Sequence, residues 1–353
     1  MLGGVQPQSR FQHLAPCAKV ILLSGRKDAK PQGPSCRGRV FETKRAGMGV
    51  IHSCPDTCPI LTATALVDVP SKCLMPGDQD IPLPVSTSIE PEFDLVQESL
   101  YREVLTLLNE RQIPYAVSGA FALQQHTGIW RVTKDLDLFL TTTAVHSALS
   151  VLRSEGFRCE ICDPVWLAKA HREDFFVDLI TGMSNAAVSV EDSWIARARP
   201  AVVVGVPTRV LAPEEVIASK LFVTRRERFD GADITHIIYG AQGDLEWDRL
   251  YALIGEHWHI LYWALVLYAY VYPAHTHYVP SSVWNDLSSR FIREATNPDG
   301  KARFRGSLVD DKMYAIDIHE WEMDDIQSEY RARVPQINSD CPVNPMPTDE
   351  TEI

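Results

Sequence analysis

The sequence lacks a long apolar run and lacks an excess of positive charge. Its most apolar run, Ile260–Tyr272, is shorter than the about 20 residues that a membrane-spanning helix needs, so we expect a buried core helix there. The chain has 34 Lys and Arg against 46 Asp and Glu, a formal net charge of -12. Because general nucleic-acid binding depends on neutralising phosphates, this balance excludes a broad nucleic-acid-binding surface. We expect a cytoplasmic protein without membrane association.

The eight cysteines show no disulfide-framework spacing. Cys54, Cys58 and Cys73 could join His52 in a zinc site, but a second ligand pair of the usual kind is missing. Unpaired thiols are therefore the favoured interpretation of this segment.

The first 90 residues also lack sustained apolar periodicity, and Pro and Gly interrupt them repeatedly. This composition predicts a disordered leader over residues 1–90. Order is expected from about Phe93, where apolar residues begin to recur at helical spacing. We predict a catalytic domain over 93–211, a helical C-terminal lobe over 212–330 and a flexible tail over 331–353.

Helical and strand-like segments alternate in the predicted catalytic domain. Helices are expected near 95–108, 120–126 and 143–155, and strands near 113–117, 132–140, 157–161, 175–180, 201–206 and 209–211, with a short strand or turn at 166–168. After Ala212 the pattern becomes helical, with helices expected over 213–229, 230–241, 244–258, 260–272 and 281–295. The fold class is therefore α/β (α+β), a mixed sheet flanked by helices and followed by a helical lobe.

Two aspartates in one strand-like run are the most informative feature of the chain. Asp135 and Asp137 are two residues apart, so their side chains project from the same face of a strand. Two close carboxylates among apolar residues need a cation, and Mg²⁺ with substrate phosphates is the usual occupant. Upstream, Ser118 and Gly119 turn a short strand into a helix, where backbone N–H groups can approach a phosphate. Asp178 lies in another apolar strand and supplies a third carboxylate.

This pattern resembles the nucleotidyltransferase superfamily, which has the fold of DNA polymerase β and of many small transferases. The family pattern is a small-residue turn that opens a helix, a strand with Asp-x-Asp, and a third carboxylate on a later strand. The run from Arg131 to Leu138, RVTKDLDL, is most similar to bacterial stand-alone nucleotidyltransferases. Some of these are toxin or abortive-infection components, and others modify small molecules. In this chain Ser118 precedes Gly119, the reverse of the family order.

The resemblance implies a nucleotidyltransferase that moves an NMP from an NTP such as ATP to a hydroxyl and releases pyrophosphate. It implies that Asp135, Asp137 and Asp178 are the catalytic and metal-binding residues, with Mg²⁺ or alternatively Mn²⁺. The nucleotide-binding residues that it implies are Ser118, Gly119, Arg131, Lys134 and Lys220. The acceptor could be a small molecule, a tRNA or a protein. A protein partner is implied only if the chain is half of a toxin–antitoxin pair, and the alternative function is an inactive binding module, an antitoxin or regulator.

Some of these residues have a second interpretation. Lys220 lies in an apolar helical stretch and either reaches the triphosphate or extends its ammonium into water. Asp233 either assists it or pairs with Arg226 or Arg228. Two H-x-H pairs near the apolar run are interpreted as ordinary polar residues: His257, His259, His275 and His277.

Overall fold

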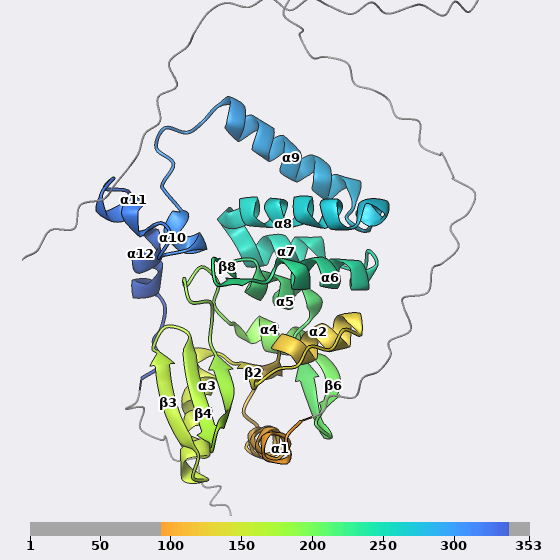
Figure 1. Ribbon diagram of the computed structural model, residues 1–353, viewed down its shortest axis with the longest axis vertical. Helices are drawn as coiled ribbons and strands as arrows, with labels where there is room; N and C mark the ends of the chain where they lie inside the picture. The colour runs from red at the N-terminus through yellow and green to blue at the C-terminus, as the bar shows by residue number, and fades with distance from the viewer. Residues whose placement is uncertain (1–92, 339–353) are drawn as a thin grey trace, which may run out of the picture. The chain divides into compact units, whose positions relative to one another are not determined.

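A seven-stranded mixed sheet forms one layer of the protein, and a stack of helices follows it (Figure 1). The computed structural model describes residues 93–338, which all lie within a single compact unit. The predicted leader, the zinc alternative at Cys54, Cys58 and Cys73, and the end of the predicted tail therefore lie outside the described residues. No helix in residues 93–338 is long and apolar enough to cross a membrane.

The sheet has the strand order β3-β4-β5-β2-β1-β7-β6. Its strands are β1 (Ala116–Val117), β2 (Asp135–Phe139), β3 (Arg158–Asp163), β4 (Leu167–Arg172), β5 (Phe175–Ile180), β6 (Arg199–Val203) and β7 (Val206–Val210). The helices between them are α1 (Leu95–Glu110), α2 (Gly119–Thr127), α3 (Thr142–Ser154) and α4 (Asp192–Arg197). The central strand β2 runs parallel to β5 and antiparallel to β1. The predicted mixed sheet with flanking helices is confirmed.

Local sequence signals explain where the first helices begin. Asp94 caps α1 by accepting a hydrogen bond from the Val96 N–H, and Thr141 caps α3 by accepting one from the Ala144 N–H. The apolar face of α1 packs on β5, β7 and α3, and α3 in turn packs on β3. This packing buries Leu100, among other residues of α1, and holds the sheet rigid beneath the site.

The helical stack begins with α5 (Pro213–Lys220) and the small hairpin β8 (Thr224–Arg225) and β9 (Arg228–Phe229). It continues with α6 (Gly231–Ala241), α7 (Trp247–Ile254), η1 (Gly255–His257), α8 (Trp258–Val271), η2 (Pro273–Tyr278) and α9 (Ser281–Thr296). Three short helices end the described chain: α10 (Gly306–Val309), α11 (Ala315–His319) and α12 (Ile326–Arg333). Helix α6 packs on α2, α5 and α8, so it joins the stack to α2, the helix that begins at the Ser118–Gly119 turn.

The structure corrects the predicted helix over 213–229, which ends at Lys220. Residues 224–229 form the β8–β9 hairpin instead. The Asp230 N–H donates to the Val223 carbonyl, and the Arg226 N–H donates to the Asp310 carboxylate. One of these bonds closes the hairpin, and the other comes from a residue more than 80 positions away. Helical spacing of apolar residues therefore could not show that the helix ends at Lys220.

Three other expectations differ from the structure. The short strand or turn expected at 166–168 is the full strand β4, and α4 was not expected at all. The helix expected to be buried, α8, buries only one face, because Tyr270 on its other face is 85% exposed. Residues 331–338, assigned to the tail, lie against the sheet: Ile337 is buried, and its N–H donates to the Pro164 carbonyl.

Candidate active site

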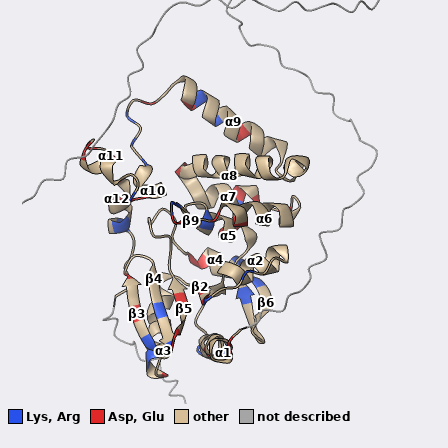
Figure 2. Ribbon diagram, in the orientation of Figure 1, with Lys and Arg blue, Asp and Glu red and all other residues tan. Residues whose placement is uncertain are grey.

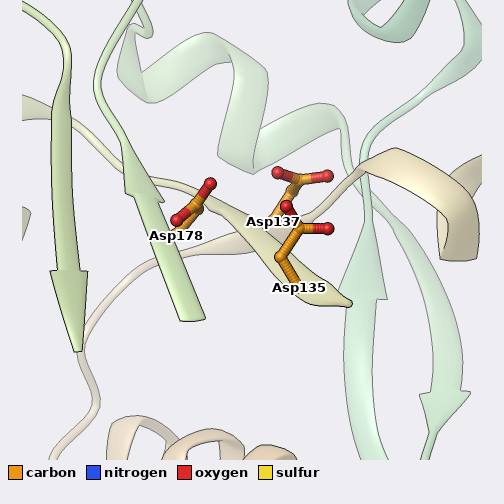
Figure 3. A group of neighbouring side chains, drawn as sticks. All are labelled: Asp135, Asp137 and Asp178. Carbon is orange, nitrogen blue, oxygen red and sulfur yellow. The ribbon is translucent and has the colours of Figure 1, made fainter. Parts of the chain in front are cut away.

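The structure brings the three predicted carboxylates together on one face of the sheet (Figure 3). In the parallel pair of β2 and β5, Asp137 is directly opposite Asp178. Asp135 precedes Asp137 by two residues and therefore shares its face. One carboxylate oxygen from each of the three lies within 4.8 Å of the other two. Their catalytic and metal-binding roles stay predictions, but the geometry that those roles require is present.

Gly119 is the residue that lets the helix α2 begin beside Asp137. Its φ of +58° lies in the left-handed region, and a Cβ added there would lie 1.9 Å from Asp137 Oδ2. The adjacent Ser118 is buried, and its N–H donates to the Asp137 carbonyl at 2.9 Å. A backbone hydrogen bond thus fixes the Ser118–Gly119 turn to β2. The absence of a side chain at Gly119 makes room for the Asp137 carboxylate.

The surroundings of Asp137 and Asp178 disfavour the charged form of both carboxyl groups. Burial, and then the charges of Asp135 and Asp178, raise the pKa of Asp137 from 3.8 to about 7. Burial also raises the pKa of Asp178, although Lys169 lowers it in part. A site that disfavours its own negative charge in this way is one that a bound cation would relieve.

Lys169 is a site residue that the sequence reasoning missed. It lies on β4 directly opposite Asp178, and its Nζ is 2.6 Å from Asp178 Oδ1. The same ammonium lies 3.7 Å from the centre of the Phe176 ring. Basic and acidic residues are accordingly adjacent where β4 adjoins β5 (Figure 2). Only the pairing of β4 with β5 places Lys169 here, and no spacing in the sequence signals it.

Lys220 is buried in an ion-pair network instead of extending into water. Its Nζ lies 2.8 Å from both Asp230 Oδ2 and Asp233 Oδ2. Arg131, another predicted nucleotide-binding residue, also pairs with Asp233. The expected pairing of Asp233 with Arg226 or Arg228 is therefore wrong; Asp233 binds Lys220 and Arg131. Lys220 is still close enough to lower the pKa of Asp137.

Arg228 is the second site residue that the sequence did not identify. It lies on β9, its side chain is 70% exposed, and its Nε is 3.1 Å from Asp230 Oδ1. That hydrogen bond raises the pKa of Arg228, and the negative charges of Asp230, Asp137 and Asp135 raise it further. An exposed guanidinium near the carboxylates is suited to contact phosphate oxygens. Lys134, which directly precedes β2, is also exposed.

The site meets the requirements of a magnesium ion on chemical grounds. The donors are carboxylate oxygens, which Mg²⁺ prefers, and one or two carboxylates with substrate phosphates are its usual ligands. Asp137 is held with a raised pKa, so the site has an uncompensated demand for positive charge. Asp135, Asp137 and Asp178 together could hold such an ion.

Comparison with known families identifies the central part of the chain. Residues 97–250 match the model of a family described as "Nucleotidyl transferase of unknown function". Residues 97–250 therefore form a nucleotidyltransferase domain. The match contains all three carboxylates, the Ser118–Gly119 turn and the β8–β9 hairpin, and it ends within α7. As a nucleotidyltransferase the chain belongs to a class of enzymes, which confirms the enzymatic prediction.

Solved structures that are similar to this chain include the following three. The solution structure of the antibiotic-resistance factor ANT(2'')-Ia is 18% identical and covers 50% of this chain and 99% of its own, with a TM-score of 0.35. The lincomycin-bound lincosamide antibiotic adenylyltransferase LnuA is 14% identical and covers 40% of this chain and 94% of its own, with a TM-score of 0.29. An antigenic nucleotidyltransferase-like protein from Paracoccidioides brasiliensis is 18% identical, with coverages of 52% and 91% and a TM-score of 0.35. No curated protein matches the chain.

Proposed function

We propose that this nucleotidyltransferase moves an NMP from an NTP to a hydroxyl acceptor and depends on Mg²⁺. The observation that supports this most is the convergence of Asp135, Asp137 and Asp178 within 4.8 Å beside the turn at Gly119. Three carboxylates collected on one sheet face have no partner arrangement that explains all of them structurally. Their convergence beside a helix N-terminus suits a metal–triphosphate complex.

In this proposal each residue has a distinct task. Asp135 and Asp137 hold the metal, and Mg²⁺, when bound, stabilises charge on the attacking and leaving oxygens. Gly119 leaves space for the Asp137 carboxylate at the start of α2, where backbone N–H groups can contact the phosphates. Arg228 contacts the triphosphate from β9, and its charge favours the departure of pyrophosphate.

The proposed transfer needs no reactant other than the NTP and the acceptor. The acceptor hydroxyl oxygen forms a bond to the α-phosphorus, and the bond from that phosphorus to the pyrophosphate oxygen breaks. Asp178 accepts the hydroxyl proton, and Lys169 keeps the Asp178 carboxylate oriented through the 2.6 Å contact. We therefore add Lys169 as a positioning residue to the three predicted aspartates.

The alternative, an inactive module that retains the fold, is less favoured by the site. A binding module would not need a carboxylate such as Asp137, whose pKa is raised by burial and by two neighbouring carboxylates, because such an arrangement costs stability. A role as an antitoxin or regulator would also require a protein partner.

The experiment is to incubate the purified full chain with each α-labelled NTP, Mg²⁺ or Mn²⁺, and a cell extract. We expect pyrophosphate release and transfer of label that stops on chelation of the metal and in Asp137→Asn. Asp174→Asn is the matched control, because Asp174 is exposed in the turn between β4 and β5 and makes the same change in charge. Binding of NTP without any transfer in the parent protein would favour the inactive module instead.

A further inference from the structure

A cavity of about 560 Å³ lies where the C-terminal helices meet the β3–β4 hairpin. Its lining combines Cys162, Trp166 and Leu167 from that hairpin with Arg225 from β8 and with residues of α11 and α12. Its volume falls within the range of about 300–1,000 Å³ that small-molecule sites occupy. Much of its wall comes from residues beyond 250, where the family match ends. The cavity is therefore a feature of this chain that the family description does not cover.

The wall contributed by the C-terminal segment is held in place by specific contacts. The buried Asp310 carboxylate accepts hydrogen bonds from three backbone N–H groups, those of Arg226, Lys312 and Met313. The buried Asn185 side chain donates to the Leu308 carbonyl at 2.7 Å. Because these contacts join segments more than 80 residues apart, the cavity has fixed walls.

Both arginines that line the cavity are held in ion pairs. Arg331 forms two 3.0 Å hydrogen bonds with the Asp163 carboxylate. Arg225 lies 3.1 Å from Asp311. Asp325 caps α12 by accepting from the Ser328 N–H. Because both arginines are already paired, the cavity offers an anionic ligand no free guanidinium among the described lining residues.

One buried polar group at the cavity lacks a partner. Gln327 lines the cavity and is 8% exposed, and its Oε1 accepts no hydrogen bond from the described residues. A buried carbonyl oxygen without a donor costs about 1–3 kcal/mol, so it calls for a ligand that carries N–H or O–H groups. Trp166, also in the lining, adds a flat aromatic surface to the same cavity.

Two structural elements connect the cavity to the three carboxylates. On β4, Leu167 lines the cavity, and Lys169 lies two residues farther along on the same face, bonded to Asp178. On the small hairpin, Arg225 lines the cavity and is paired directly with Arg228, whose charge interacts with Asp137. Strand β4 and the β8–β9 hairpin therefore each carry one residue that lines the cavity and another that interacts with the carboxylates.

We infer that this cavity binds the acceptor of nucleotidyl transfer, and that the acceptor is a small neutral molecule with several hydroxyl groups. One hydroxyl donates to Gln327 Oε1, an apolar ring face packs on Trp166, and another hydroxyl extends past Leu167 to Asp178. The inference rests on the proposed function, because it assigns a place and a chemical class to the acceptor. A tRNA end or a protein side chain are the competing acceptors.

The test separates an extract into a filtrate below about 1 kDa, the size of a drug-like ligand, and the retained protein and tRNA. Each fraction is incubated with the full chain, Mg²⁺ and α-labelled NTP. We expect label in the filtrate, on a product whose label a phosphodiesterase releases as NMP. The product without its nucleotidyl group should be uncharged on ion-exchange resin.

Two variants then test the cavity with that filtrate as the probe. Gln327→Leu and the cavity-filling Ala315→Trp are expected to raise the apparent KM for the filtrate by about tenfold or more, since each removes a contact or space that the acceptor needs. The affinity for NTP, measured with a fluorescent analogue, should be unchanged. Ala302→Trp, at an exposed position, is the control for the added indole. Gln327→Leu is expected to melt no lower than the parent, because it removes an unpaired buried carbonyl.

The outcomes separate this inference from the proposed function. Label in tRNA or protein alone, or parental KM values in both cavity variants, would overturn the inference and leave nucleotidyl transfer intact. Absence of transfer to every fraction, with no pyrophosphate release, would overturn both. Filtrate labelling that both cavity variants weaken and Ala302→Trp does not would support the inference.

Discussion

Replacing Asp137 with Asn should stabilise the metal-free protein while abolishing transfer. Asn has the shape of a protonated Asp, so the substitution removes the charge and keeps the packing. The pKa of Asp137 is raised from 3.8 to about 7, because burial and two neighbouring carboxylates disfavour its ionised form. Ionising it in the folded protein therefore costs free energy that the unfolded chain does not pay.

The magnitude follows from the difference between these two pKa values. At 1.36 kcal/mol for each pKa unit, a rise from 3.8 to about 7 corresponds to about 4 kcal/mol. Asp137 is only half-buried, and water will relax part of this cost, so we expect about 1–3 kcal/mol.

The direction of the Asp137 pKa shift determines how the stability difference between the parent and Asp137→Asn depends on pH. Because the folded-state pKa is raised, the parent loses stability as pH rises from about 4 to about 7, and the loss is complete above that range. Asp137→Asn has no such loss at this position. The variant should therefore match the parent near pH 4 and exceed it above about pH 7.

The assay is urea unfolding of both proteins in EDTA, at about pH 5 and about pH 8. Mg²⁺ should then stabilise the parent more than the variant, since the variant has lost a ligand. Asp174→Asn, an exposed substitution of the same kind, should show no such pH-dependent gain. A variant that is equal to or less stable than the parent at about pH 8 in EDTA would refute the electrostatic reasoning.

Three further substitutions test the residues around the carboxylates. Gly119→Ala should destabilise by about 1–3 kcal/mol and lower transfer strongly, since its Cβ meets Asp137 Oδ2; Gly205→Ala, with positive φ but open space, should show the strain alone in the same melting and transfer assays. Lys220→Met should cost about 1–3 kcal/mol, because Asp230 and Asp233 lose the buried cation that they share while each keeps an arginine partner, and an unchanged melting temperature would contradict the ion-pair network. Lys169→Met should lower kcat with little change in NTP affinity, while Lys169→Arg should restore part of the loss; equal losses in both would argue against positioning.

The active-site pattern was predictable because its signals are local. Strand alternation alone places Asp135 and Asp137 on one face, and the Ser118–Gly119 turn marks the start of a helix. The structure adds a steric reason for the glycine, since a Cβ there would collide with Asp137. Helix starts at Asp94 and Thr141 are also local, because a capping side chain bonds to a backbone N–H two or three residues away.

What depended on distant partners could not be predicted in this way. The helix from Pro213 ends at Lys220 because residues 224–229 pair with each other and with Asp310, which lies more than 80 residues away. Lys169 reaches Asp178 only through the register of β4 on β5.

The sequence by itself determined that this chain carries a paired-carboxylate strand behind a glycine turn, because both features are written in neighbouring residues. Only the tertiary structure decided which basic side chains lie near that strand and which cavity lies close to it. Strand register and the docking of the C-terminal helices bring together residues as far apart as Asp163 and Arg331. Such contacts arise when whole helices and strands pack together, so the spacing of residues along the sequence does not predict them.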